Sequence, residues 1–274
     1  MATVTLPPMV SLVRHRYDPA GAGPVLAALS GWTPPDAPGG GLHPGDVGWQ
    51  LRFDDATVLL WTQDSAPVAA GFLDESVLRV TAAPGADLAA LAADAEELLE
   101  PGNDATDGLP MPGWERDPQA WLVLSWSPRP VSSRAGPVGE SDAADRVLVQ
   151  RSAFAGSTFT VDRWRAMKRS PAGGLAVEVL TRTPAGEPAA AATGWFAGAG
   201  RCGLLEPVGT HPDHRGHGYG RDAVLGACAA LAERGAPAVA VVTPAANKAA
   251  VALYRSAGFT LVRENHDWVR PAAG

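Results

Sequence analysis

The second half of the chain alternates segments of strand-like and helix-like apolar pattern, and this alternation restricts the fold more than any other feature. Residues 175–182, 189–196 and 202–210 have the composition of strands. A glycine-rich loop, residues 211–220, separates the third of these from residues 224–231, whose apolar side chains recur at helical spacing. A strand followed by a glycine loop and a helix is typical of α/β proteins.

The alternation continues to the end of the chain. Residues 238–243 (AVAVVT) form an apolar run between two prolines, as a strand buried on both faces would. Asn247 is a predicted helix N-cap, Gly258 ends that helix, and a last strand is expected from Phe259. This order predicts an α/β fold with a mixed, partly parallel twisted sheet flanked by helices.

Composition excludes some classes of protein and partner. Of the 274 residues, 46% are hydrophobic and 19% are charged, which is the range of folded globular chains rather than disordered ones. The net charge of −7 argues against a nucleic-acid partner, because binding to phosphates needs an excess of Lys and Arg. A cationic partner is favoured instead.

The cysteines and apolar segments bear on the compartment. Cys202 and Cys228 belong to no CxxC or Cys/His spacing, so they are expected to be free thiols in a reducing environment. The first ten residues lack the pattern of a signal peptide. Charged residues and Pro237 interrupt the apolar stretch 223–246, so no membrane span is expected. These features predict a cytoplasmic protein without a membrane partner.

Two segments rich in proline and glycine divide the chain. The segment SPRPVSSRAGPVGE, which begins at residue 127, has no apolar periodicity and reads as a linker. We therefore predict a domain over residues 1–127, a linker over 128–140 and a second domain over 141–274. Residues 31–46 are expected to form a loop without helix or strand, as a lid or irregular arm of the first domain.

The loop RGHGYG, residues 215–220, fits the pattern R-x-x-G-x-G between a predicted strand and a predicted helix. Backbone N–H groups at a helix N-terminus form an anion site, and glycines let a diphosphate approach without Cβ clashes. The simpler alternative is a surface turn before a helix. A dinucleotide fingerprint does not fit, since no acidic residue ends a second strand about 20 residues on.

Two motifs in this region carry a family resemblance. The sequences VGTHPDHRGHGYG and, about 30 residues later, NKAAVALYRSAGF resemble the acetyl-CoA-binding core of the GNAT N-acetyltransferase superfamily, over residues 201–270. The resemblance implies that the strand before the loop bulges and splays from its neighbour, and that the pantetheine arm of acetyl-CoA inserts there like another strand.

Roles of single residues follow from the same resemblance. Val208 and Thr210 would exchange backbone hydrogen bonds with pantetheine, Gly209 would face the thioester carbonyl, Asn247 would also bond pantetheine, and Tyr254 would face the sulfur. The pyrophosphate would bind the amides of the loop and first helical turn, contributed by Arg215, Gly216, His217, Gly218, Tyr219, Gly220 and Arg221.

Acetyl transfer to an amine requires proton removal from the ammonium and favours a proton donor at the departing thiolate. Glu206, two residues before Val208, is the candidate base, acting directly or through water. Its alternative is a strand-end carboxylate in solvent or paired with Arg. Tyr254 is the candidate general acid, and its alternative is a core tyrosine.

Three histidines and the tryptophans permit other interpretations. His211, His214 and His217 could be proposed as a metal cluster, but a hydrogen bond or charge complementarity beside a diphosphate explains them, and no metal is expected. The nine tryptophans are mostly expected in the core or between the domains, although Trp164 and Trp195 are candidates to touch substrate.

The first half repeats the order of the second in a weaker form. Residues 58–61, 68–72 and 76–81 are predicted strands, Asp87 precedes a predicted helix that ends near residue 99, and residues 120–126 form a further strand. The loop before the helix lacks R-x-x-G-x-G and places Asp87 where an anion would bind. We therefore predict two GNAT-like domains, of which the first is degenerate and has no cofactor site.

Together these features predict an acetyl-CoA-dependent N-acetyltransferase that acts on a primary amine of a small molecule. The acidic composition and the Ala/Gly/Arg-rich sequence suggest a basic antibiotic, an aminoglycoside or a cationic peptide, as the acceptor in self-resistance. The alternatives are acetylation of a metabolite, a thiol precursor or a protein N-terminus, or a non-catalytic acyl-CoA-binding module. The oligomeric state is left open.

Overall fold

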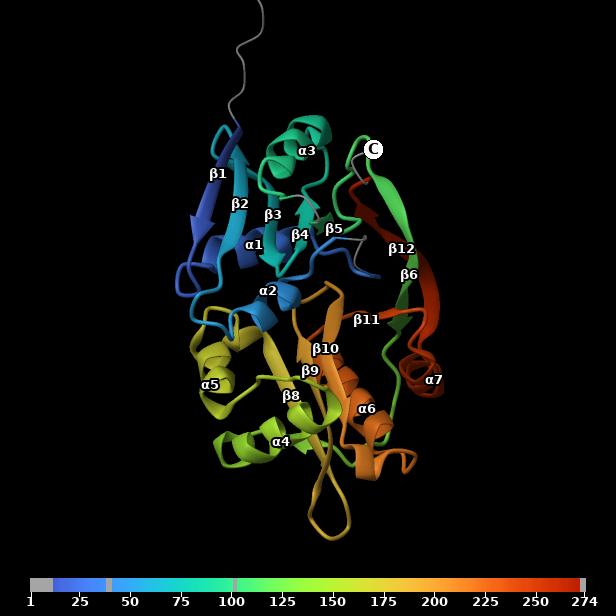
Figure 1. Cartoon of the computed structure of the whole chain (residues 1–274). Helices are drawn as coiled ribbons and strands as arrows, with labels where there is room; N and C mark the ends of the chain where they lie inside the picture. The colour runs from blue at the N-terminus through green and yellow to red at the C-terminus, as the bar shows by residue number, and fades with distance from the viewer. Residues whose placement is uncertain (1–11, 38–40, 101–102, 272–274) are drawn as a thin grey trace, which may run out of the picture.

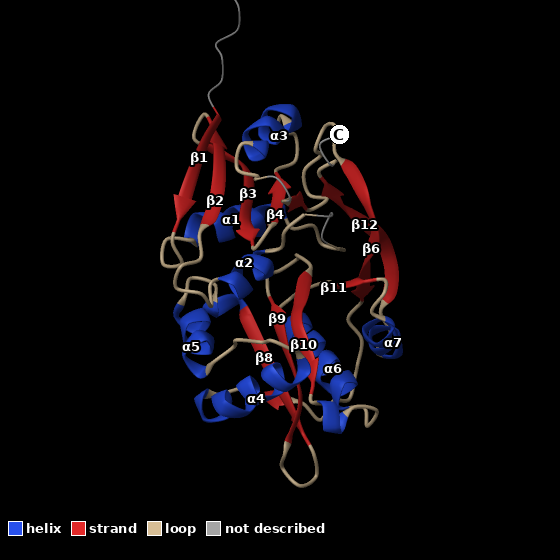
Figure 2. Cartoon of the chain, in the orientation of Figure 1, coloured by secondary structure: helices blue, strands red, loops and turns tan. Residues whose placement is uncertain are grey.

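Twelve strands form one mixed sheet that runs through both halves of the chain (Figures 1 and 2). The computed structural model describes residues 12–37, 41–100 and 103–271. The strand order is β1-β2-β3-β4-β5-β12-β6-β11-β10-β9-β8-β7. This arrangement confirms the predicted α/β class with a mixed, partly parallel sheet, since β4–β5 and β10–β11 are parallel pairs and the other pairs are antiparallel.

The elements of the first half are β1 (Leu12–Tyr17), α1 (Gly23–Trp32), α2 (Pro44–Gln50), β2 (Val58–Gln63), β3 (Ala66–Asp74), β4 (Val77–Ala82), α3 (Leu88–Glu96), β5 (Asp104–Ala105) and β6 (Glu115–Trp126). Those of the second half are β7 (Gly136–Pro137), α4 (Ala143–Ala153), α5 (Val161–Arg169), β8 (Ala176–Arg182), β9 (Pro188–Trp195), β10 (Gly203–Thr210), α6 (Tyr219–Glu233), β11 (Val239–Pro244), α7 (Lys248–Ser256) and β12 (Thr260–Val269). Short 3₁₀ turns occupy Glu140–Asp142, Gly173–Leu175 and Pro212–His214.

The two halves exchange their last strands. Strand β6, from the first half, lies between β11 and β12 and pairs antiparallel with both. Strand β12 lies between β6 and β5, and its edge opposite β6 pairs with β5 of the first half, through Trp268 and Ala105. The two long strands run side by side along one edge of the view in Figure 1. The predicted division into residues 1–127 and 141–274 stays a prediction, and the sheet crosses it.

One of the hydrophobic cores is shared by both halves. Val25, Leu29 and Val47 from α1 and α2 pack in one cluster with Trp164 and Trp195 from the second half. Both tryptophans are almost fully buried there. Trp164 and Trp195 therefore have the core positions expected of most tryptophans, and burial of this shared apolar surface holds the halves together.

The expected loop over residues 31–46 is wrong at both ends. Gly31 and Trp32 close α1, and α2 begins at Pro44. Proline is favourable at the first helical position because its fixed φ suits the helix and its missing N–H would be unpaired there. His43 then caps α2, since its side chain accepts a hydrogen bond from the amide of Gly45. The sequence analysis also did not predict β1, α1, α4 and α5.

A buried ion pair fixes α4 to the sheet. Arg146 of α4 donates to Glu178 of β8 at 3.2 Å, and both side chains are 1% exposed. Gln150 and Thr193 accept from the same guanidinium, and the indole of Trp164 donates to the second oxygen of Glu178 at 2.6 Å. These hydrogen bonds satisfy the charges in the interior, where an unpaired charge would be costly.

Candidate acetyl-transfer site

The glycine loop lies where the sequence predicts it, between β10 and α6. Gly216 and Gly218 have φ values of +79° and +81°, which residues with a Cβ rarely adopt. Gly218 is the N-cap of α6, and no described side chain caps this helix end. The first N–H groups of α6 are thus free of side-chain partners and lie at the positive end of the helix dipole.

The side chains around this loop are mostly engaged elsewhere. Tyr219 is buried and stacks on His217, while Arg221 donates from Nε to the carbonyl of Ser256 at 3.0 Å. A Cβ at Gly220 would lie 2.5 Å from Oγ1 of Thr210, so only glycine fits there. The amides, rather than the side chains of Tyr219 and Arg221, are what this loop offers a ligand.

Strand β10 separates from β11 after a short contact. The two strands pair only at Gly203 and Leu204 among the described residues. On its other side β10 shows a register shift between Leu205 and Val208, and Val208 to Thr210 then pair with β9. Beyond Leu204, no described residue of β11 pairs with this edge of β10. Its backbone groups are therefore available to an extended ligand.

Gly209, Asn247 and Tyr254 are the remaining residues that the sequence assigns to the cofactor site, and their roles there stay predictions. A Cβ at Gly209 would come within 2.8 Å of Ala153, because the end of α4 packs there. Asn247 caps α7 by accepting from the amide of Ala250 at 3.1 Å, which leaves its amide hydrogens for a ligand. Tyr254 is buried, and burial raises the pKa of its hydroxyl well above the usual range, so the proton stays on it.

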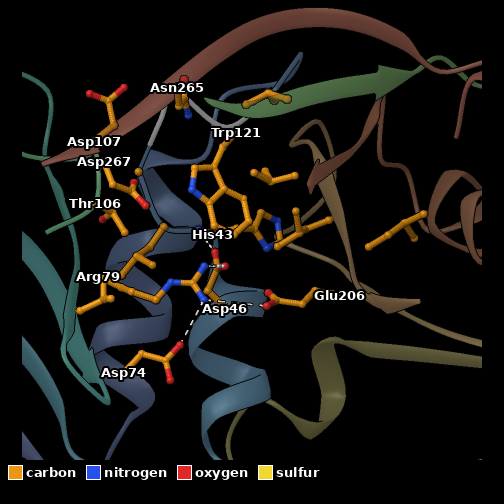
Figure 3. A pocket seen from close by; sticks show the side chains of 17 residues that line it. His43, Asp46, Asp74, Arg79, Thr106, Asp107, Trp121, Glu206, Asn265 and Asp267 are labelled. Atoms are coloured by element: carbon orange, nitrogen blue, oxygen red, sulfur yellow. Dashed lines mark hydrogen bonds and ion pairs between the residues drawn. The ribbon is translucent and has the colours of Figure 1, made fainter. Parts of the chain in front are cut away.

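Glu206 projects into a cavity of about 290 Å³ between the two halves (Figure 3). Eleven of the seventeen residues that line this cavity come from the first half of the chain. Glu206 is the only one of them that the sequence identified as a site residue. Its neighbours Asp46, Arg79 and Trp121 were missed, because no local motif marks residues that tertiary folding alone assembles.

The charges in the cavity form a connected cluster. Nη2 of Arg79 donates to Oδ1 of Asp46 at 2.6 Å. Nη1 of the same side chain lies 3.7 Å from Oδ2 of Asp74 and 3.9 Å from Oε1 of Glu206 (Figure 3). One oxygen of Glu206 faces Arg79. The alternative given for this residue, a carboxylate paired with Arg, therefore holds for that oxygen.

The other oxygen of Glu206 accepts no hydrogen bond from a donor group of the described residues. Oε2 is buried, although the side chain as a whole is 28% exposed where it meets the cavity. The pKa of Glu206 is raised to about 8. Burial is the main cause, the charge of Asp46 and a side-chain hydrogen bond with Asp46 add to the rise, and Arg79 opposes it. A carboxyl with this pKa exchanges its proton near neutral pH, as a catalytic base must.

The corresponding helix of the first half is closed to anions. Oδ1 of Asp87 accepts from the amides of Ala89 at 3.1 Å and Ala90 at 3.2 Å, at the N-terminus of α3. The carboxylate thus occupies the donors that a diphosphate would need. The absence of a cofactor site in the first half stays a prediction.

The three histidines each have a separate neighbour. His211 accepts from the amide of Asp213, His214 lies 3.8 Å from Glu187, and His217 contacts the carbonyl of Arg215 at 2.8 Å. Within the described ranges, no group of three or more His, Cys, Asp or Glu side chains could hold a metal ion. Cys202 and Cys228 are buried free thiols. None of the described helices is long and apolar enough to cross a bilayer.

Comparisons with known proteins agree with this geometry. The profile of the acetyltransferase (GNAT) family matches residues 147–259. No curated protein matches the sequence.

Solved structures resemble nearly the whole chain. A GCN5-related N-acetyltransferase from Sphaerobacter thermophilus is 18% identical, with a TM-score of 0.52 over 98% of both chains. A tandem GNAT protein from the clavulanic acid biosynthesis pathway is 15% identical, with a TM-score of 0.57 over 96% of this chain and 100% of that one. A GNAT-family acetyltransferase from Colwellia psychrerythraea is 12% identical, with a TM-score of 0.59 over 95% and 99%.

The profile match identifies a GNAT acetyltransferase domain at residues 147–259, and the structural likeness shows the same fold extending through the first half. The predicted resemblance and fold class are therefore confirmed. Acetyl transfer is the chemistry of this family.

Proposed function

We propose that this protein is an acetyl-CoA-dependent N-acetyltransferase whose acceptor is the primary amine of a small cationic molecule. The observation that carries the proposal is Oε2 of Glu206, which accepts no hydrogen bond from a described donor and lies at the cavity next to the point where β10 leaves β11. A base and a strand-shaped opening thus meet at one place, as transfer from a bound thioester to an amine requires.

The residues present fit acetyl-CoA, which would supply the activated acetyl thioester. The unpaired edge of Val208 and Thr210 suits the amides of a pantetheine arm, and Asn247 can donate to it. The uncapped start of α6 and the amides of residues 215–221 suit a diphosphate. These assignments extend the residue roles that the family resemblance implies.

Glu206 and Tyr254 would handle the protons. A protonated amine near Oε2 of Glu206 gains a charged hydrogen bond once the carboxyl is ionised, and the carboxylate then accepts a proton from nitrogen, directly or through water. Burial raises the pKa of Tyr254, so its hydroxyl keeps its proton and can donate a hydrogen bond to a departing thiolate; proton transfer to the thiolate requires this pKa to fall when the cofactor is bound. Neither role requires a metal.

The charge of the cavity supports a cationic acceptor. Asp46, Asp74, Asp107, Glu206 and Asp267 line it together with a single arginine, Arg79. The imidazole of His43 adds no charge, because burial lowers its pKa to about 4. An aminoglycoside or a cationic peptide fits this description, and so do smaller amines.

The test measures free thiol released from acetyl-CoA by the full-length chain. The panel contains kanamycin, polymyxin B, spermidine, 1,5-diaminopentane and a peptide with a free N-terminus, with acetate as an anionic control. Cysteine is tested by mass spectrometry of the product alone, because its own thiol would mask the readout. Turnover with a cationic amine supports the proposal, and mass spectrometry identifies the acetylated nitrogen. Tight binding of acetyl-CoA without turnover of any member would favour a non-catalytic acyl-CoA-binding module instead.

A further inference from the structure

We propose that the first half of the chain, which is predicted to have no cofactor site of its own, contributes to the acceptor site: Arg79 and Asp46 act as positioning residues that hold Glu206 and set its readiness to accept a proton. This inference rests on the proposed function, in which Glu206 is the base. It gives the first half a role in catalysis rather than one in folding alone.

Helix α2 contacts the second half of the chain through Trp195. Gly45 and Gly48 pack flat on the indole of Trp195, so that a Cβ at either glycine would lie within about 2.5 Å of its ring or Cβ. His43 adds a polar contact, because its Nε2 lies 3.0 Å from the carbonyl of Cys202. Since Nδ1 of His43 accepts from Gly45, Nε2 carries the proton and donates it.

The same tryptophan also holds the backbone of Glu206. Nε1 of Trp195 donates to the carbonyl oxygen of Glu206 at 2.6 Å. The same indole therefore contacts α2 on its ring and the backbone of Glu206 through its nitrogen. Helix α2 and Glu206 are held to one rigid side chain, and Asp46 of α2 is brought beside the Glu206 carboxyl.

Asp46 and Arg79 are joined to each other and to their surroundings by hydrogen bonds. Asp46 accepts from the backbone amide of His43 at 2.7 Å and from Arg79 at 2.6 Å, so its carboxylate is fixed by two hydrogen bonds. Arg79 in turn reaches Oε1 of Glu206. With Oε1 turned to Arg79, Oε2 is the oxygen left for the acceptor (Figure 3).

Asp46 and Arg79 shift the pKa of Glu206 in opposite directions. The negative charge of Asp46 raises the pKa of Glu206, and the positive charge of Arg79 lowers it. The other charged or titratable groups that bear on Glu206 or Arg79 from neighbouring elements are Arg52, Asp74, Tyr254 and Asp267. Opposite shifts on removal of Asp46 and Arg79 are a signature that general loss of packing would not produce.

The experiment titrates Glu206 directly in the full-length chain, so that it needs no acceptor. The protein is labelled with ¹³C at the glutamate side-chain carboxyl, and the resonance of Glu206 is identified by its loss in Glu206→Gln. We expect the midpoint to rise in Arg79→Met and to fall in Asp46→Asn, each by about 1 unit or more, as charges within 4–6 Å commonly cause. Arg79→Lys keeps the charge and should restore most of the wild-type midpoint.

Two glycine variants test the contact with Trp195. Gly48→Ala should shift the Glu206 midpoint, because the added Cβ pushes α2 from the indole. Gly31→Ala, in α1, is the matched control and should not, since a Cβ there meets nothing within 4 Å. Acetyl-CoA affinity, measured by calorimetry, should stay unchanged in all variants and verifies that each is folded.

The outcomes separate this inference from the proposed function. Shifts of the same sign in Arg79→Met and Asp46→Asn, or unchanged midpoints in both, would overturn the positioning role even if the enzyme acetylates amines. Opposite shifts in a protein that acetylates no amine would leave the coupling of the halves intact and reject the acceptor chemistry instead.

Discussion

The indole Nε1 of Trp195 and the carbonyl oxygen of Glu206 are joined by a hydrogen bond of 2.6 Å. This bond ties the last residue of β9 to the irregular part of β10, between Leu205 and Val208, where the register shifts. Because the backbone of Glu206 is held there, its side chain projects into the cavity between the halves rather than into solvent.

Replacement of Glu206 by Gln tests the base. The variant keeps the size of the side chain and removes its charge, so kcat/KM for the acceptor should fall by about 10²- to 10⁴-fold, while acetyl-CoA affinity stays unchanged. In the wild type, kcat/KM should rise with pH through the pKa of Glu206, about 8, and this acidic limb should vanish in the variant. A variant with the wild-type rate and limb would assign the base to another group or to water.

The same carboxyl should make stability depend on pH. Because the pKa of Glu206 is raised from 4.5 to about 8 on folding, its contribution to stability is complete below pH 4.5 and is lost as the pH rises to 8. Glu206→Gln has no such loss, so its stability relative to the wild type should increase between pH 5 and pH 9. Urea denaturation at the two pH values measures this difference, and an equal difference at both would show that the carboxyl is not perturbed.

Tyr254→Phe tests the general acid. The ring keeps its packing against Phe259, and only the hydroxyl is lost. Since general-acid help is worth about 10²- to 10⁴-fold, kcat should fall by this range with little change in thermal stability. Steady-state kinetics and a melting curve measure both, and a variant with normal kcat would return Tyr254 to the core role.

Gly218→Val tests the loop, with Gly85→Val as its matched control. Both glycines have φ of +81°, so valine strains both turns equally, but only Gly218 begins a helix whose amides are free of side-chain caps. We expect the dissociation constant of acetyl-CoA to rise at least about tenfold in Gly218→Val and to stay constant in Gly85→Val. Weaker binding in Gly85→Val would indicate a cofactor site in the first half after all.

Glu178→Gln tests the buried ion pair. Loss of the charge leaves Arg146 unpaired in the interior, which costs about 3–5 kcal/mol of unfolding free energy. Glu140→Gln is the control, because Glu140 pairs with Arg165 at the surface, where solvent screens the charges. Chemical denaturation should show a large shift for the first variant and none for the second; similar shifts for both would mean that burial does not govern these pairs.

Sequence alone determined the elements whose signals are local. Apolar periodicity predicted β8 to β12, α6 and α7, since strand and helix periods are properties of neighbouring residues. The glycine loop was recognisable because its backbone conformation excludes side chains, and Asp87 because a capping carboxylate needs only its own helix.

Tertiary structure decided what depends on residues far apart in the chain. No local pattern predicts that β6 enters between β11 and β12, because pairing between long strands is set by the packing of whole halves. The loop expected over residues 31–46 ends early, because His43 and Pro44 start α2 and Trp195 packs against that helix. Asp46, Arg79 and Glu206 lie up to 160 residues apart in the sequence, and the fold brings them together at one cavity. Only there can the charges of Asp46 and Arg79 shift the pKa of Glu206.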